Sequence, residues 1–275
     1  MAFQEKERGN KLLAEKKASE AIEAFTRGLA LLDGEASSEA ATELHSVLLS
    51  NRSAAHASLR HWNEALADAE QAIKLRPTWS KAHARAGLAL FQLLRGEDSL
   101  NAYKRALELE PSDALRANVK QAQDLVQAVE WTVLAEGFAA KQNWVAAEEH
   151  FKRSVELASH AQLFWASKSH ANTKIGNFAA AIADADKAIQ LAPDWFRGFH
   201  RKAEALYSQR KFDDALQWYG YAVQLAPDVA SLKSEFAQCQ HEALNARRRA
   251  AYEEQIKKAK EDEEKAKQAS AGDKK

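Results

Sequence analysis

The sequence has a single cysteine, no long apolar run and no excess of either charge. Cys239 alone can form neither an intramolecular disulfide nor a zinc site built from several cysteines, which indicates a reducing compartment and a small core residue. No eighteen apolar residues run together and the first residues are charged, so neither a membrane-spanning helix nor a signal peptide is predicted. Lys plus Arg equals Asp plus Glu at 39 each, without the basic excess of nucleic-acid or membrane-surface binding. We therefore expect a soluble, cytoplasmic protein with neither nucleic acid nor membrane as partner.

Motifs for catalysis or metal binding are missing as well. The sequence has no glycine-rich phosphate loop and no G-x-S-x-G elbow. His241 and Glu242 begin like a zinc-protease motif, but the fourth residue after His241 is Asn245 instead of a second histidine. The nine histidines are scattered along the chain. We expect a protein that is not an enzyme and binds neither cofactor nor metal.

Only four prolines and ten glycines interrupt the chain, so helix is the expected state over most of its 275 residues. The prolines reveal a repeat, because Pro77 and Pro111 lie 34 residues apart, as do Pro193 and Pro227. Each follows a helix of similar pattern. Six such helices are predicted, at Ala21–Leu32, Ala65–Leu75, Ser99–Leu109, Ala146–Leu157, Ala181–Leu191 and Ala215–Leu225.

Each of these six helices is preceded by another in which small and bulky residues alternate at spacings of three and four, as Gly87 does with Leu90. The period and the helix pairs resemble tetratricopeptide repeats over about residues 2 to 227. The resemblance implies an all-α solenoid of six repeats in two three-repeat modules, in which the first helices of the pairs line a concave groove for extended peptides.

Three segments follow from this repeat pattern. Leu115, Val119, Ala122 and Val126 form an apolar stripe typical of a helix that caps the third repeat. We therefore predict an N-terminal module at 1–128, a C-terminal module with its own capping helix at 129–244, and a charged helical tail at 245–275 that frays at its end.

The tail is expected to be a helix without a core, because it has almost no apolar stripe. Four Glu-to-Lys pairs at i, i+4 support it, at Glu253 with Lys257, Glu254 with Lys258, Glu261 with Lys265 and Glu263 with Lys267. A surplus around 34–43 lengthens the first connection and is expected to extend the flanking helices at the surface.

Five polar residues on the predicted first helices are the main candidates for a binding site. Lys6 and Asn10 share one helix face, as do Lys81 and Arg85, and Asn51 lies on the helix between them. Two carboxylates at the end of an acidic peptide need several donors, which cations and amides supply.

The motifs KERGN, SNRSAAH and WSKAHAR place these five residues in a register that resembles the dicarboxylate clamp of chaperone-binding tetratricopeptide domains, such as those of the Hsp-organising cochaperones. The resemblance implies that Lys6, Asn10, Asn51, Lys81 and Arg85 grip the last residue of a Glu-Glu-Val-Asp tail of a heat-shock chaperone, of the seventy- or ninety-kilodalton class. The chain then resembles a non-catalytic cochaperone adaptor.

The same register in the second module gives Thr132, Glu136, Ser167, Arg197 and Arg201. Glu136 would repel a carboxylate, so the family function does not extend to this module. Arg197 and Arg201 form a basic patch for a different acidic segment, and pairing of Glu136 with an arginine is an equal alternative. A second protein partner is left open. The alternative for the whole chain is a scaffold or assembly factor whose grooves bind other acidic segments.

Overall fold

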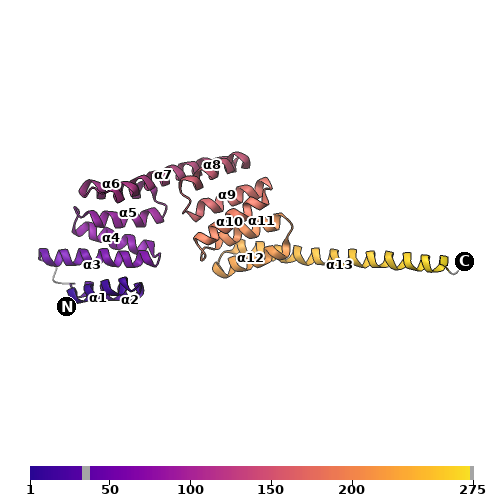
Figure 1. Cartoon of the computed structure of the whole chain (residues 1–275), viewed down its shortest axis with the longest axis horizontal. Coiled ribbons are helices and arrows are strands. Elements are labelled where there is room, and N and C mark those ends of the chain that lie inside the picture. Colours follow the sequence, from indigo (N-terminus) through magenta and orange to yellow (C-terminus); the bar gives the residue numbers. More distant parts are fainter. Residues whose placement is uncertain (33–37, 273–275) are drawn as a thin grey trace. The chain divides into compact units, whose positions relative to one another are not determined.

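The computed structural model describes residues 1–32 and 38–272, apart from the side chains of 264 and 266–272. In this part of the chain the only regular secondary structure is α-helix, which confirms the predicted all-α class (Figure 1). Residues 34–37 of the predicted surplus lie outside the description. The helices are α1 (Ala2–Ala14), α2 (Ala18–Ala30), α3 (Glu39–Ser58), α4 (Trp62–Leu75), α5 (Ser80–Gln92), α6 (Gly96–Leu109), α7 (Asp113–Ala140), α8 (Trp144–Leu157), α9 (Gln162–Ile175), α10 (Phe178–Leu191), α11 (Phe196–Ser208), α12 (Phe212–Leu225) and α13 (Ala230–Gly272).

The six helices predicted from the repeat are α2, α4, α6, α8, α10 and α12, and each begins two or three residues earlier than predicted. The cause lies in the turn before each helix. Its residue with positive φ is Lys16, Arg60, Leu94, Gln142, Gly176 or Arg210. Such a left-handed residue closes the preceding helix in a Schellman motif. His61 N, for example, donates to His56 O at 2.9 Å. The next helix therefore starts at once.

Residue contacts divide the chain into two compact units. Unit 1 comprises Met1–Val133 with Arg153–Ala161, and unit 2 comprises Leu134–Lys152 with Gln162–Lys275. Helix α7 is continuous from Asp113 to Ala140, so the predicted capping helix runs on without a break. The module boundary after residue 128 stays a prediction.

Unit 1 is built from helix pairs that pack in chain order from α1 to α6 (Figure 1). The first helix α3 also contacts both α1 and α5, so the side chains of these three helices can form one shared face. Phe25, Leu48 and Leu49 are fully buried between the layers. This packing brings residues distant in sequence onto one surface.

Unit 2 repeats the arrangement with helices α9 to α12, and α13 packs against α12. Leu232 and Cys239 on α13 are fully buried in its core. Cys239 is therefore the small core residue that the sequence predicts.

An ion pair at equivalent positions ties a first helix to its partner in both units. In unit 1, Arg52 on α3 binds the buried Asp68 on α4 through two hydrogen bonds of 2.8 and 2.7 Å. In unit 2, Lys168 on α9 binds Asp184 on α10 at 2.9 Å. Because these carboxylates are buried, their pairing fixes the rotation of α3 and α9.

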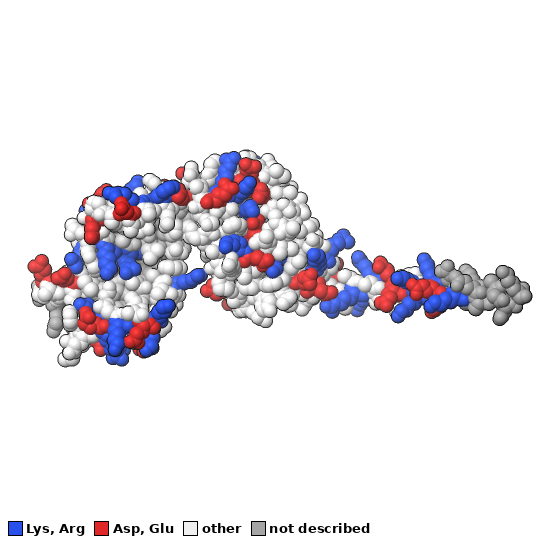
Figure 2. Space-filling model, viewed as in Figure 1, with Lys and Arg blue, Asp and Glu red and all other residues white. Residues whose placement is uncertain are grey.

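Beyond the core residue Ala243, α13 carries alternating charges (Figure 2). The predicted pair of Lys258 with Glu254 is present at 3.6 Å, whereas Lys257 lies 3.9 Å from Glu261 instead of Glu253. The helix continues to Gly272. Within the described residues, no helix is long and apolar enough to span a membrane.

Candidate functional site

The five predicted clamp residues all lie in unit 1, on its three first helices. Lys6 and Asn10 are on α1, Asn51 is on α3, and Lys81 and Arg85 are on α5. Helix α3 contacts both α1 and α5, so it joins the three helices on one face.

Two of the five are joined directly. Asn51 Nδ2 donates a hydrogen bond of 2.8 Å to Asn10 Oδ1 across α1 and α3. The pair is partly buried, and the bond fixes which way the two amides point. Because Asn10 accepts through its oxygen, its Nδ2 group is left as a donor for a ligand.

Lys6 is engaged elsewhere in this structure. Its Nζ lies 3.0 Å from Glu7 Oε1 and 4.0 Å from the centre of the Phe3 ring. Both neighbours are on α1 and exposed, so these contacts are weak in water. The structure therefore does not bring Lys6 onto the asparagine pair.

Lys81 and Arg85 face a cavity of about 310 Å³ between α5, α6 and α7, which we call the α5–α7 cavity. Leu88, Tyr103, Asn118 and Gln121 are also in its lining. Within the described part of the chain, neither cation has an ion pair or a hydrogen bond to another side chain. The cavity thus combines two unneutralised cations with apolar and amide walls.

Desolvation makes these cations receptive to an anion. Burial lowers the pKa of Lys81, and the neighbouring charge of Arg85 lowers it further. Burial also lowers the pKa of Arg85, which is half-buried. A carboxylate in the cavity would offset both effects, because an opposite charge favours the charged form.

The equivalent arginine of unit 2 is neutralised by the chain itself. Arg201 Nη1 lies 2.7 Å from Glu204 Oε2 and 3.1 Å from His170 Nδ1. Lys174 lies 3.2 Å from the other oxygen of Glu204. Burial alone would raise the pKa of Glu204, but the hydrogen bond with His170 and the charge of Arg201 hold it well below its usual range.

Two basic residues beside the predicted patch have carboxylate partners. His200 lies 2.6 Å from Glu235 on α13, and Lys202 lies 2.6 Å from Asp186 on α10. In the described part of unit 2, Arg197 has no carboxylate partner, and it lies near the rings of Trp195 and Phe196. Of the two predicted patch residues, Arg201 is therefore paired and Arg197 is not.

The remaining second-module positions do not form a clamp. The Thr132 hydroxyl, which the chain buries, lies 3.0 Å from the Ala128 carbonyl oxygen and 2.9 Å from the Ser154 hydroxyl. Glu136 is exposed and has no ion-pair partner in the described residues, so the predicted pairing with an arginine is absent. Ser167 is half-buried on α9.

The sequence interpretation missed Tyr103, Glu204 and Glu235. A usable signal existed for Glu204, because it follows Arg201 by three residues and so shares its helix face. Glu235 and Tyr103 gave no such signal, since each meets the site from another helix.

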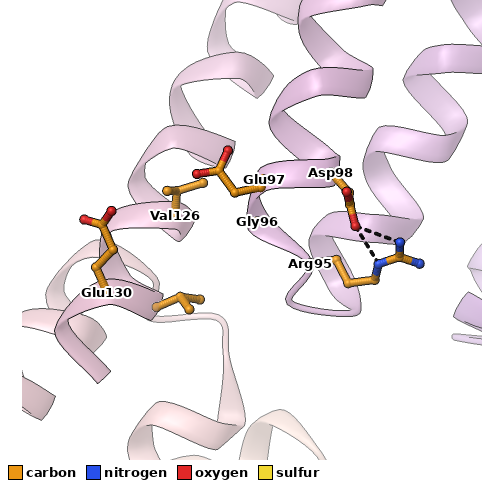
Figure 3. A pocket seen from close by; sticks show the side chains of 7 residues that line it. Arg95, Gly96, Glu97, Asp98, Val126 and Glu130 are labelled. Carbon is orange, nitrogen blue, oxygen red and sulfur yellow. Dashed lines mark hydrogen bonds and ion pairs between the residues drawn. The ribbon is translucent and has the colours of Figure 1, made fainter. Parts of the chain in front are cut away.

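A second cavity of unit 1, of about 270 Å³, is acidic (Figure 3). It lies where the turn before α6 meets α7, with Val126 beside Gly96. Arg95 pairs with Asp98 at 2.7 Å, while Glu97 and Glu130 line the cavity and have no ion-pair partner in the described residues (Figure 3). It is unsuited to a carboxylate.

Within the described residues, no group of three or more His, Cys, Asp or Glu side chains could hold a metal ion.

Comparison with known proteins supports the repeat architecture. A tetratricopeptide repeat family model matches residues 164–194. The small glutamine-rich tetratricopeptide repeat-containing protein 2 of Saccharomyces cerevisiae is 30% identical over 138 residues, which cover 50% of this chain and 37% of that protein. The Hsp70-Hsp90 organizing protein 3 of Arabidopsis thaliana is 31% identical over 241 residues, covering 79% of this chain and 41% of that protein.

The chain thus spans less than half the length of these two curated relatives. Among solved structures, the TPR domain of P58(IPK) matches with a TM-score of 0.55 and 18% identity, over 90% of this chain and 80% of that one. The helix pairs, the 34-residue period and the match to P58(IPK) show the fold of a tetratricopeptide-repeat solenoid, and the family model places one such repeat at residues 164–194.

Proposed function

We propose that the chain is a non-catalytic cochaperone adaptor, whose unit 1 binds the acidic C-terminal tail of heat-shock chaperones. Lys6, Asn10, Asn51, Lys81 and Arg85 hold the two carboxylates of the last residue of a tail of the Glu-Glu-Val-Asp type. The adaptor works in the cytoplasm and needs no cofactor.

The observation that carries this proposal is the unneutralised pair Lys81 and Arg85 in the α5–α7 cavity. Cations that are partly desolvated and unpaired gain more from an anion than exposed ones do. The Asn10–Asn51 pair adds oriented amide donors on the neighbouring helices.

The relatives support the choice of partner. One of them is by its name an organizing protein of Hsp70 and Hsp90, and its match covers most of this chain. The match leaves more than half of that relative uncovered, so we transfer only peptide binding by the repeats.

The test compares two double variants of the full chain. Lys81→Ala with Arg85→Ala should weaken a peptide ending in Glu-Glu-Val-Asp at least tenfold from a roughly micromolar Kd, measured by calorimetry, because each charge-assisted hydrogen bond contributes about 1.5–3 kcal/mol. The matched control is Lys104→Ala with Arg105→Ala, which removes the same charge from exposed positions on α6 of unit 1. The control should bind as the parent does.

The same measurement distinguishes this function from the alternative of a scaffold that binds internal acidic segments. A peptide whose terminal carboxylate is amidated should lose most of its affinity for a clamp. An unchanged Kd for the amidated peptide, or for the Lys81 and Arg85 variant, would refute the proposed function.

A further inference from the structure

The α5–α7 cavity contains a buried group that the terminal clamp does not use. Tyr103 on α6 is only 4% exposed, and its hydroxyl has no hydrogen-bond partner among the described residues. Its ring packs on Gly87, where a Cβ would come within 2.9 Å of the ring. Burial raises the pKa of Tyr103 to about 12, so the hydroxyl stays protonated at neutral pH and can donate. Because Tyr103 lines the cavity, its hydroxyl is placed to donate to a ligand there.

Unit 2 shows what kind of group lies beside the equivalent arginine and tyrosine. Tyr219 and Arg201 correspond to Tyr103 and Arg85, each 116 residues further along the chain. At the position of Leu88, unit 2 has Glu204, whose carboxylate lies 2.7 Å from Arg201.

A second carboxylate of unit 2 acts on Tyr219 through its charge. At the position of Ala84 stands His200, which lies 2.6 Å from Glu235 and has its ring 5.9 Å from that of Tyr219. Besides burial, the charges of Glu235 and Glu204 raise the pKa of Tyr219. Unit 2 therefore places one carboxylate on its arginine and two carboxylates within electrostatic range of its tyrosine, where unit 1 has Ala84, Leu88 and a cavity.

We propose that the α5–α7 cavity is a second carboxylate subsite, which takes the side chain of an acidic residue upstream of the ligand's C-terminal residue, with Arg85 and the Tyr103 hydroxyl as donors. This inference rests on the proposed function, since the terminal residue must be held by unit 1. Arg85 serves both subsites, because a guanidinium has five N–H donors. Leu88 and Phe91 exclude water from the pair.

The first experiment is a double-mutant cycle on the full chain. The probes are a peptide ending in Glu-Glu-Val-Asp and peptides with Gln in place of either or both glutamates. Replacing both should weaken binding to the parent about tenfold, and Tyr103→Phe should weaken the unchanged peptide about tenfold, as expected for a charge-assisted hydrogen bond. The two losses should overlap, so that the Gln peptide loses little further affinity with Tyr103→Phe.

The matched control is Tyr219→Phe, which removes the equivalent hydroxyl from unit 2 and should leave the Kd unchanged. Thermal unfolding separates binding from folding. Because the Tyr103 hydroxyl has no hydrogen-bond partner among the described residues, Tyr103→Phe should not lower the midpoint.

A second variant introduces into unit 1 the carboxylate that unit 2 carries. Leu88→Glu should pair with Arg85 and weaken the tail peptide at least tenfold, whereas the uncharged Leu88→Gln should weaken it much less. Equal Kd values for these two variants would count against a carboxylate subsite.

The outcomes distinguish the subsite from the clamp. If Tyr103→Phe and the Gln peptides bind as their parents do while amidation of the peptide terminus abolishes binding, the subsite is refuted and the terminal clamp stands. If amidation has no effect either, the proposed function itself is wrong.

Discussion

Units 1 and 2 share a repeat frame and an arginine at the same position, yet they treat that arginine in opposite ways. In unit 1, Arg85 faces a cavity and has no ion-pair partner in the described residues. In unit 2, Arg201 is bound by Glu204 and His170. The frame preserves the place of the cation, and the neighbouring side chains determine whether it is available to a ligand.

The largest expected difference concerns stability. Glu204→Leu should destabilise the chain by about 3 kcal/mol, because removal of one member of a buried ion network leaves the others uncompensated. Arg201 and Lys174 would both lose their counter-charge. Urea unfolding measures this effect. Glu235→Leu is the comparison variant. Because the Glu235 side chain is more exposed, its replacement should lower the free energy of unfolding less.

The pH dependence is the control for this prediction. The pKa of Glu204 is lowered by folding, so its stabilisation is complete above the unfolded value of about 4.3 and is lost as pH falls toward the folded value. Glu204→Gln should therefore flatten the decline in stability below about pH 4.3. A parent and a Gln variant with parallel pH profiles would contradict the role of the charge.

A smaller difference is expected in binding. Arg85→Ala should weaken the tail peptide about tenfold, or 1.4 kcal/mol, whereas Arg201→Ala should change the Kd less than about twofold. Both variants are made in the full chain and titrated with the same peptide. Equal losses would show that unit 2 also holds the peptide and that the comparison of the two arginines is wrong.

The smallest effect is expected at the tail. Truncation after Asn245 should lower stability by less than about 1 kcal/mol, because exposed ion pairs contribute little. The pair with another helix that it removes is Arg247 with Asp213, at 2.6 Å. Truncation after Arg249 keeps that pair and serves as the control. A large loss of stability or of peptide affinity after truncation at Arg249 would mean that residues beyond 249 pack on a unit.

The helix pairs could be predicted because the 34-residue spacing of prolines is a property of the sequence alone. The starts of the second helices were placed too late, since the Schellman turns at residues such as Arg60 and Leu94 use side chains without turn preference. Only Gly176 among the six turn residues signals a left-handed conformation by its type.

The repeat register could give the positions of the five predicted clamp residues, but it could not give the contacts that their side chains make. The contact of Lys6 with Glu7 and the hydrogen bond between Asn10 and Asn51 depend on side-chain rotamers. Arg201 is bound by Glu204. His200 is bound by Glu235 from α13, which meets α11 only in the folded unit. Pairing across helices is set by packing, which a repeat pattern does not encode.

The hydrogen bond between Asn10 and Asn51 has an entropic consequence. Ordering a flexible side chain on binding costs about 0.5–1.5 kcal/mol. The two asparagines are already immobilised across α1 and α3 before any peptide arrives. Lys6 must leave Glu7 and Phe3 and be ordered anew. The amide half of the proposed site is therefore preorganised, and we expect the loss of freedom on binding to fall mainly on the lysines and on the peptide itself.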